Sequence, residues 1–162
     1  MKIDILCVGK IKESFYRDAV SEYSKRLSRY CSLNIYEVSD EKTPDNCSET
    51  EKNKILEKEA ERLLKYIPEA SSDCHIITLE IKGKKLSSEK MASTIENLNI
   101  NGKSHLIFVI GGSLGLHNSI TSKSNLALSF SDMTFPHQLM RVILLEQIYR
   151  SFRIINNEPY HK

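Results

Sequence analysis

Residues 105–115 of the chain read HLIFVIGGSLG, an apolar run that ends in three glycines within five residues. The run has the length and the β-branched content of a strand that is buried on both faces. Glycines after such a strand let the backbone approach a ligand closely, and open parallel sheets bind small molecules at this edge. The same pattern also suits a tight turn without a ligand, and these residues alone leave both interpretations open.

The glycines do not form a known phosphate-binding motif. The dinucleotide pattern G-x-G-x-x-G is absent, and so is the P-loop pattern G-x-x-x-x-G-K-[ST]. Asp132 follows Gly112 by twenty residues, but a lone acid at that offset is weak evidence for a ribose contact. The missing phosphate-binding motifs therefore disfavour an α/β enzyme that uses a dinucleotide or a nucleoside triphosphate.

Similar apolar runs recur along the chain and alternate with stretches of helical period. This alternation predicts an α/β fold with a mostly parallel sheet of five to six strands flanked by helices. A helix is expected between the first two runs, from about Ile11 to Tyr30, with basic side chains on its wet face. The predicted strands are Ile3–Val8, Leu33–Val38, His75–Ile81, His105–Ile110 and Asn125–Phe130.

Local signals predict where the next helices begin and end. Ser39–Ser48 lacks apolar periodicity and is expected to be a long mobile loop. Ser48 followed by Glu51 fits a capping box, and Pro68 would end that helix just after Ile67. A shorter helix is expected to start at Ser87 or Ser88.

The last predicted helix, His137–Ile155, is apolar around most of its circumference. Such a helix needs cover on more than one side, and burial in a single core would require a larger domain. We therefore expect a homodimer. Arg141 and Arg150 interrupt the apolar surface, and each could bind an RNA phosphate or a carboxylate within the dimer.

A second candidate ligand loop precedes this helix, in residues 126–137, LALSFSDMTFPH. Pro136 suits a first helical turn, with Thr134 or Phe135 near the cap and free amide groups around the helix start. The positive helix end would lower the pKa of His137 and favour a neutral imidazole that can accept a proton. A purely structural histidine fits the same position.

Composition sets the broad class. The 162 residues, 40% of them hydrophobic, suffice for one domain, residues 1–162, with a net charge of +2 from 23 basic and 21 acidic residues. This balance excludes a histone-like polycation. The charge is uneven, because residues 1–30 hold seven basic against four acidic residues and residues 37–61 hold four against nine. Both segments could be solvated faces, or the basic one could contact a phosphate backbone.

Other features exclude several classes of protein. No apolar run reaches the ~18–20 residues of a membrane span, and the chain begins without a signal sequence, so we expect a cytoplasmic protein without a membrane partner. The four cysteines form no C-x-x-C pair, so no metal site is predicted. Reduced, inert thiols are expected, with a nucleophilic thiol at Cys7 as the alternative. The tail ends in Tyr160, His161 and Lys162, which could stack on a base and pair with a phosphate, although its composition is also typical of a frayed terminus.

Several motifs together resemble one family along the whole chain and in the same order. That family is the bacterial 23S ribosomal RNA pseudouridine N3-methyltransferases, small members of the SPOUT or α/β-knot methyltransferases. The terminal Y-H and the T-x-P-H motif are the most specific elements. The matching segments are MKIDILCVGK (1–10), ITLEIKGK (77–84), FVIGGSLGL (108–116), MTFPHQ (133–138) and PYHK (159–162).

The resemblance implies a C-terminal trefoil knot, a homodimer and S-adenosylmethionine as cofactor. It implies as substrate the N3 atom of the pseudouridine at position 1915, in helix 69 of 23S rRNA, on assembled 70S ribosomes. A non-catalytic ribosome-binding protein with the same fold is the alternative. The implied cofactor-binding residues are Leu79, Gly111, Gly112, Gly115, Phe130, Ser131, Asp132, Met133, Thr134 and Phe135, and the catalytic candidates are His137, His161, Tyr160 and Arg150.

For the proton on N3, a neutral His137 is the preferred base, with His161 from the tail of a partner subunit as the other candidate. The resemblance assigns no function to the acidic segment Asp40–Asn46.

Overall fold

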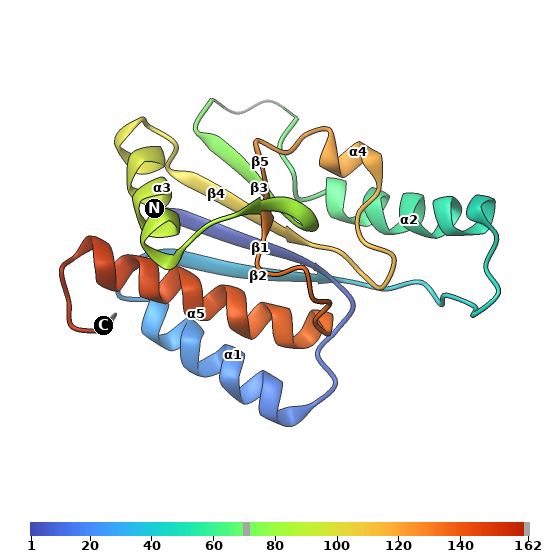
Figure 1. Cartoon of the computed structure of the whole chain (residues 1–162), viewed down its shortest axis with the longest axis horizontal. Helices are drawn as coiled ribbons and strands as arrows, with labels where there is room; N and C mark the ends of the chain where they lie inside the picture. The colour runs from blue at the N-terminus through green and yellow to red at the C-terminus, as the bar shows by residue number, and fades with distance from the viewer. Residues whose placement is uncertain (70–71, 161–162) are drawn as a thin grey trace.

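A computed structural model describes residues 1–69 and 72–160 of the chain. The described residues form one five-stranded sheet in the order β2-β1-β4-β3-β5, and every strand pair is parallel (Figure 1). The predicted α/β fold with a parallel sheet is therefore confirmed. The strands are β1 (Lys2–Val8), β2 (Ser32–Val38), β3 (Cys74–Lys85), β4 (His105–Ile110) and β5 (Leu126–Ser129).

Helices cover both faces of the sheet (Figure 1). Side chains alternate along a strand, so in β1 Ile5 packs with α1, α3 and α5, whereas Leu6 packs with α2 and α4. Both residues are fully buried, and each face of the sheet has its own apolar core. The helices are α1 (Ser14–Leu27), α2 (Glu49–Leu64), α3 (Ser88–Ile100), α4 (Asn118–Thr121) and α5 (His137–Ile155).

The capping signals locate two helix starts. Ser48 forms the predicted capping box with Glu51 at the start of α2, and Ser87 rather than Ser88 caps α3. Helix α2 ends at Leu64, three residues before the predicted end. Pro136 is the N-cap of α5 rather than a residue of its first turn, so the helix begins at His137.

Strand β3 differs most from the prediction. Leu79 and Lys84 both pair with Leu128 of β5, so the chain between them loops out of the sheet. A Cβ atom added to Gly83 would lie 2.8 Å from the backbone of Ala127, so this return to the sheet requires glycine. This irregularity places residues 80–83 beside the carboxyl end of β5.

Helix α5 is packed against both α1 and α3 on one face of the sheet (Figure 1). Leu144, Leu145 and Ile148 are fully buried, and no residue in the helix, all of which is described, is classed as exposed. Much of its apolar surface is thus covered within one copy, while side chains such as Leu139 and Val142 remain half-buried. None of the helices in the described part of the chain is long and apolar enough to cross a membrane.

Candidate functional site

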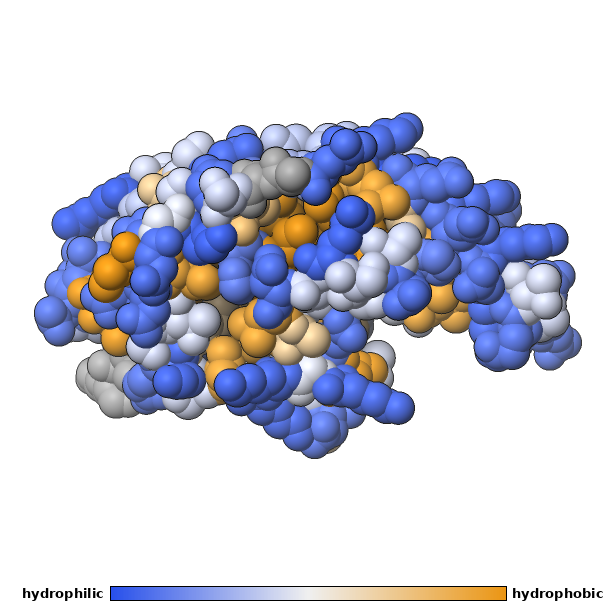
Figure 2. Space-filling model, turned by 90° about the horizontal axis from the view of Figure 1, so that it is seen from above, coloured by the Kyte–Doolittle hydropathy of each residue, from blue (hydrophilic) through white to orange (hydrophobic). Residues whose placement is uncertain are grey.

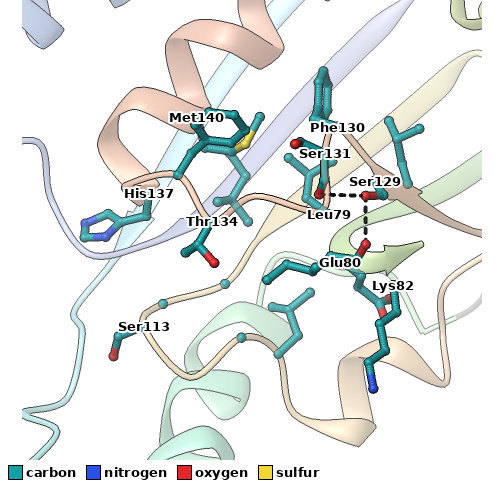
Figure 3. Close-up of a pocket in the computed structure, with 18 of the residues that line it drawn as sticks. Leu79, Glu80, Lys82, Ser113, Ser129, Phe130, Ser131, Thr134, His137 and Met140 are labelled. Carbon is teal, nitrogen blue, oxygen red and sulfur yellow. Dashed lines mark hydrogen bonds between the residues drawn. The ribbon is translucent and has the colours of Figure 1, made fainter. Parts of the chain in front are cut away.

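A cavity of about 800 Å³ opens at the carboxyl ends of β3, β4 and β5 (Figure 3). Its volume lies within the range of roughly 300–1,000 Å³ that is usual for small-molecule sites. The loop after β4 and the loop between β5 and α5 provide most of the wall. Nine of the ten predicted cofactor-binding residues line it, namely Leu79, Gly111, Gly112, Gly115, Phe130, Ser131, Met133, Thr134 and Phe135.

The glycine loop is tight as well as adjacent to the cavity. A Cβ atom added to Gly111 would lie 2.3 Å from the carbonyl oxygen of Gly115, and Gly115 itself has a φ of +88°. The amide of Gly115 donates to the carbonyl of Gly112 at 3.1 Å. Both interpretations of the glycines therefore hold at once, since the turn needs them and their backbone also lines the cavity.

The loop between β5 and α5 is fixed by side-chain hydroxyl groups. Ser129 Oγ donates to the carbonyl oxygens of Ile81, at 2.8 Å, and of Ser131, at 3.1 Å (Figure 3). The amide of Met133 donates to Ser131 Oγ at 3.0 Å. These bonds tie the loop to the looped-out segment of β3, while Met133 stays 73% exposed at the cavity.

Glu80 and Lys82 line the opposite end of the cavity from His137 (Figure 3). The fully buried Thr78 donates its hydroxyl to Glu80 Oε1 at 2.6 Å. Sequence reasoning missed these two residues and also Met140, although Met140 lies about one turn after the helix start that it had marked. Thr121 of α4 also lines the cavity and had no signal in the sequence.

His137 lies where the cavity meets the loop after β1. Its pKa is lowered from the ordinary 6.5, first by burial and then by the charges of Arg141 and Lys12, with Asp40 opposing them. The predicted direction is thus confirmed, but burial and neighbouring cations cause the shift. The imidazole is held neutral near pH 7 and can accept a proton.

Arg141 does not reach the surface. Its side chain is 1% exposed and forms an ion pair with Glu37 of β2 in the same chain, while it also donates to the carbonyl oxygens of Val8 and Gly9. The predicted contact with an RNA phosphate is therefore wrong for Arg141, whereas the other alternative, a carboxylate partner, holds with Glu37 of the same chain. A buried guanidinium requires such partners, and the interior supplies them here.

Arg150 and Tyr160 are brought together away from the cavity of the same chain. Arg150 pairs with Glu146 at 2.6 Å and lies over the ring of Tyr160, with its Cζ 4.7 Å from the centroid. Burial raises the pKa of Tyr160 to about 12. Thirteen residues of α5 separate Arg150 from His137, which is roughly 20 Å along a helix. His161, the other predicted base, lies outside the described residues.

Asp132 is the tenth predicted cofactor-binding residue, and it does not line the cavity. Its carboxylate, 79% exposed, forms an ion pair with Lys85. The loop turns this side chain toward β3, so a direct contact with a ligand in the cavity is not supported.

The side chains and backbone that line the cavity suit an organic ligand. Apolar side chains such as Leu79, Phe130 and Met140 share the wall with glycine backbone. No group of three possible metal-ligating side chains occurs among the described residues. Cys7 is buried, and burial raises the pKa of its thiol to about 12, so it is not a nucleophile near neutral pH.

A family model described as predicted SPOUT methyltransferase matches residues 1–161. The chain belongs to the SPOUT methyltransferase family. A ribosomal RNA large subunit methyltransferase H from Clostridium botulinum is 57% identical over all 162 residues of both proteins. A protein from Methanococcus vannielii that carries the same name provisionally is 63% identical, again over the full length of both. The expected restriction to a bacterial family is therefore not confirmed, because a Methanococcus protein is among the most similar relatives.

Proposed function

We propose that the chain, acting as one domain over residues 1–162, uses S-adenosylmethionine to methylate N3 of the pseudouridine at position 1915, in helix 69 of 23S rRNA on assembled 70S ribosomes. The observation that carries this proposal is the convergence of two backbone-rich loops on a cavity that also contains the partly buried, neutral His137. Full-length similarity to rRNA methyltransferases in other organisms supports the substrate class. Ribosomes place such an enzyme in the cytoplasm.

The cavity fits the cofactor by size and by chemistry. Its volume of about 800 Å³ is sufficient for a nucleoside with an amino-acid chain, and its walls offer apolar surface beside unobstructed backbone. The backbone at Gly111 and in the segment Phe130–Phe135 would hold the cofactor, with Leu79 as an apolar wall. When bound, the cofactor supplies an activated methyl group.

The residues of the chain would then perform two tasks. Loops fixed by Ser129 and Ser131 orient the reactants, which is where most of the acceleration in a group transfer of this kind comes from. His137 accepts the N3 proton as the ring attacks, because its lowered pKa leaves the Nε2 or Nδ1 lone pair free near pH 7.

We further propose a homodimer and the trefoil knot of the SPOUT family. Arg150 is roughly 20 Å along α5 from His137, and Tyr160 contacts Arg150, so the pair would serve a cavity that belongs to a second copy. An arrangement in which the tail of one subunit completes the site of the other would bring all four catalytic candidates together.

The test is methyl transfer from labelled S-adenosylmethionine to 70S ribosomes that lack the modification, with the product located by mass spectrometry of 23S rRNA. We expect one methyl group on the pseudouridine N3 and none on ribosomes that carry uridine at that position. Transfer elsewhere would change the assigned substrate. Ribosome binding without transfer, together with no heat of cofactor binding in calorimetry, would instead support the non-catalytic alternative.

A further inference from the structure

The segment Gly9–Glu13, between β1 and α1, lies against the candidate active site and has no assigned function. A Cβ atom added to Gly9 would lie 3.0 Å from Nε2 of His137, so the segment begins in contact with the proposed base. The sequence left open whether the basic N-terminal region is a solvated face or a phosphate contact. We propose that Lys10, Lys12 and Phe15 form a binding surface for the single-stranded RNA that flanks the target nucleotide, an inference that rests on the proposed function.

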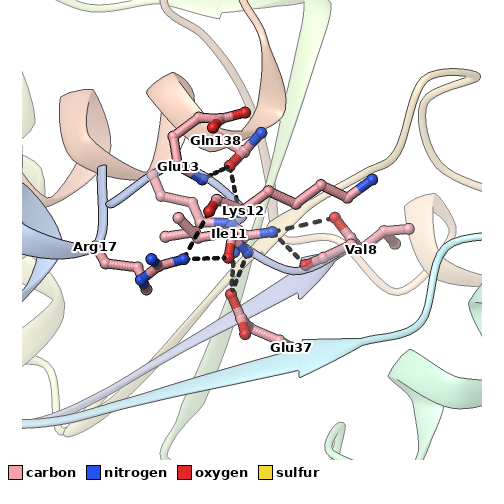
Figure 4. A network of polar contacts seen from close by, with 9 residues as sticks. Val8, Ile11, Lys12, Glu13, Arg17, Glu37 and Gln138 are labelled. Atoms are coloured by element: carbon pink, nitrogen blue, oxygen red, sulfur yellow. Dashed lines mark hydrogen bonds and ion pairs between the residues drawn. The ribbon is translucent and has the colours of Figure 1, made fainter. Parts of the chain in front are cut away.

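The backbone of this segment is held from three elements (Figure 4). The amide of Ile11 donates to Glu37 Oε1 of β2 at 3.1 Å, and the amide of Lys12 donates to Gln138 Oε1 of α5 at 2.7 Å. Arg141 of α5 donates to the carbonyl of Gly9, and Arg17 of α1 donates to that of Lys12 at 2.7 Å. The segment is thus preorganised, so little conformational entropy would be lost when it binds a partner.

The lysine side chains, by contrast, remain available. Lys10 and Lys12 are exposed, and no ion pair or hydrogen bond of either ammonium group is found within the described part of the chain. In Figure 4 the side chain of Lys12 extends away from the contacts that hold its backbone. Because the amide of Lys12 donates to Gln138, the residue directly after His137, this lysine lies near the place where the target base would react. Two free ammonium groups on a fixed backbone can neutralise RNA phosphates and release their counterions.

An exposed aromatic ring follows these cations closely in the sequence. Phe15, in the first turn of α1, is 62% exposed, and its ring centroid is 4.3 Å from that of Tyr16 at a tilt of 52°. Aromatic faces beside a cationic track are the usual composition of single-strand binding surfaces. Unpaired bases in RNA loops are accessible to such stacking.

The charges around the segment favour RNA over a second copy of the chain. The acidic groups near it are Glu13, Asp40 and Glu37, and Glu37 is already paired with Arg141. Against them stand Lys10, Lys12 and the partly engaged Arg17. A twofold interface centred on this surface would bring the lysines of both copies together, which like-charge repulsion disfavours. A polyanion meets no such penalty.

The experiment compares the double variant Lys10→Gln/Lys12→Gln with a matched double variant of exposed lysines on or beside α2, Lys54→Gln/Lys65→Gln. We expect the first to raise the KM for ribosomes several-fold and to reduce the log–log salt slope of binding by roughly 1.5 to 2, as for two lost phosphate contacts. The affinity for S-adenosylmethionine, measured by calorimetry, should not change. The control variant should retain the wild-type KM and slope.

Phe15 provides a second arm. Phe15→Leu removes the stacking face but keeps apolar bulk, so the KM for ribosomes should rise. Phe15→Tyr keeps an aromatic face and should retain the wild-type KM. Unchanged KM and salt slope in active lysine variants would overturn the RNA surface, and so would a switch to monomers at equal stability. An inactive wild-type protein would instead count against the proposed function, which keeps the two failures apart.

Discussion

Gly9 and His137 touch across the carboxyl edge of the sheet, although 128 positions separate them in the sequence. Gly9 has a φ of +83°, and a Cβ atom there would lie 3.0 Å from Nε2 of the imidazole. The glycine thus permits both the turn after β1 and the position of the candidate base. The orientation of the imidazole ring therefore depends on the loop after β1 as well as on α5.

Gly9→Ala should therefore impair the enzyme more than it destabilises the fold. The left-handed backbone costs about 1–2 kcal/mol for a residue with a side chain, and the methyl group would also displace the imidazole. Gly102→Ala is the matched control, because Gly102 has a φ of +79° and nothing within 4 Å of the added atom. Both variants should lose similar stability in urea unfolding, and only Gly9→Ala should lose kcat. Equal activity in the two would refute the steric part of this argument.

The pH dependence of methyl transfer should reflect the lowered pKa of His137. Because folding holds this pKa below 6.5, kcat/KM should stay on its plateau as the pH falls through 6.5 and decline only at lower pH. The free energy of unfolding also depends on this ring. Its contribution is present above pH 6.5 and is lost as the pH falls from 6.5 through the lowered pKa of the folded protein. A profile of kcat/KM between about pH 5 and 8 measures the midpoint, and a midpoint above 6.5 would contradict the assignment.

Arg141 offers a way to separate charge from geometry. Arg141→Met combined with Glu37→Gln removes the ion pair and should let the pKa of His137 rise toward its ordinary value, since Arg141 is one of the groups that lower it. Arg141→Lys retains the charge and should leave the midpoint nearly unchanged. Arg141→Met alone should cost about 1–3 kcal/mol, because it leaves the buried carbonyl oxygens of Val8 and Gly9 without their donor. Denaturant unfolding and the pH profile measure the two effects, and identical midpoints in all variants would show that the charge of Arg141 does not lower the pKa of His137.

Gly111→Ala should abolish cofactor binding. The added methyl would lie 2.3 Å from the Gly115 carbonyl oxygen, so the glycine loop would have to move away from the cavity. Gly115→Ala meets nothing within 4 Å and strains only its own backbone at a φ of +88°. Calorimetry with S-adenosylmethionine should therefore show no binding for the first variant and weakened binding for the second. Wild-type affinity in Gly111→Ala would mean that the loop does not hold the cofactor.

The surface around α2 differs in hydropathy from the middle of the molecule. The end that carries α2 is hydrophilic, whereas apolar residues gather toward the middle of the same face (Figure 2). Helix α2 lies in the acidic region that the sequence separated from the basic N-terminus. An α2 variant is therefore an appropriate control for charge effects near His137.

Helices and helix starts whose sequence signals lie within one or two turns were predicted correctly. Helix α5 runs from His137 to Ile155 as its apolar content indicated, and Ser48 and Glu51 form their capping box. These features depend on neighbouring residues within one or two turns. The loop within β3 escaped prediction because its cause, the close approach of Gly83 to Ala127, involves another strand.

The candidate site divides in the same way. Gly111 and Thr134 could be marked from the sequence because glycine turns and helix starts have local signatures. Glu80 and Thr121 could not, since only the looped β3 and the short α4 bring them to the cavity. The pairing of Arg141 with Glu37 depends on α5 crossing the end of β2, and no spacing in the chain encodes it.

By itself, the sequence determined the order of the strands and of the four longer helices, though not α4. It also determined the two candidate ligand loops and, through its motifs, the family. Tertiary structure alone decided which arginine is buried, which acid turns away from the cavity and what lies against the imidazole. The reason is physical. Periodicity and capping are set by interactions a few residues apart, whereas burial, charge pairing and the pKa of His137 are set by groups that meet only when parallel strands end at the same edge.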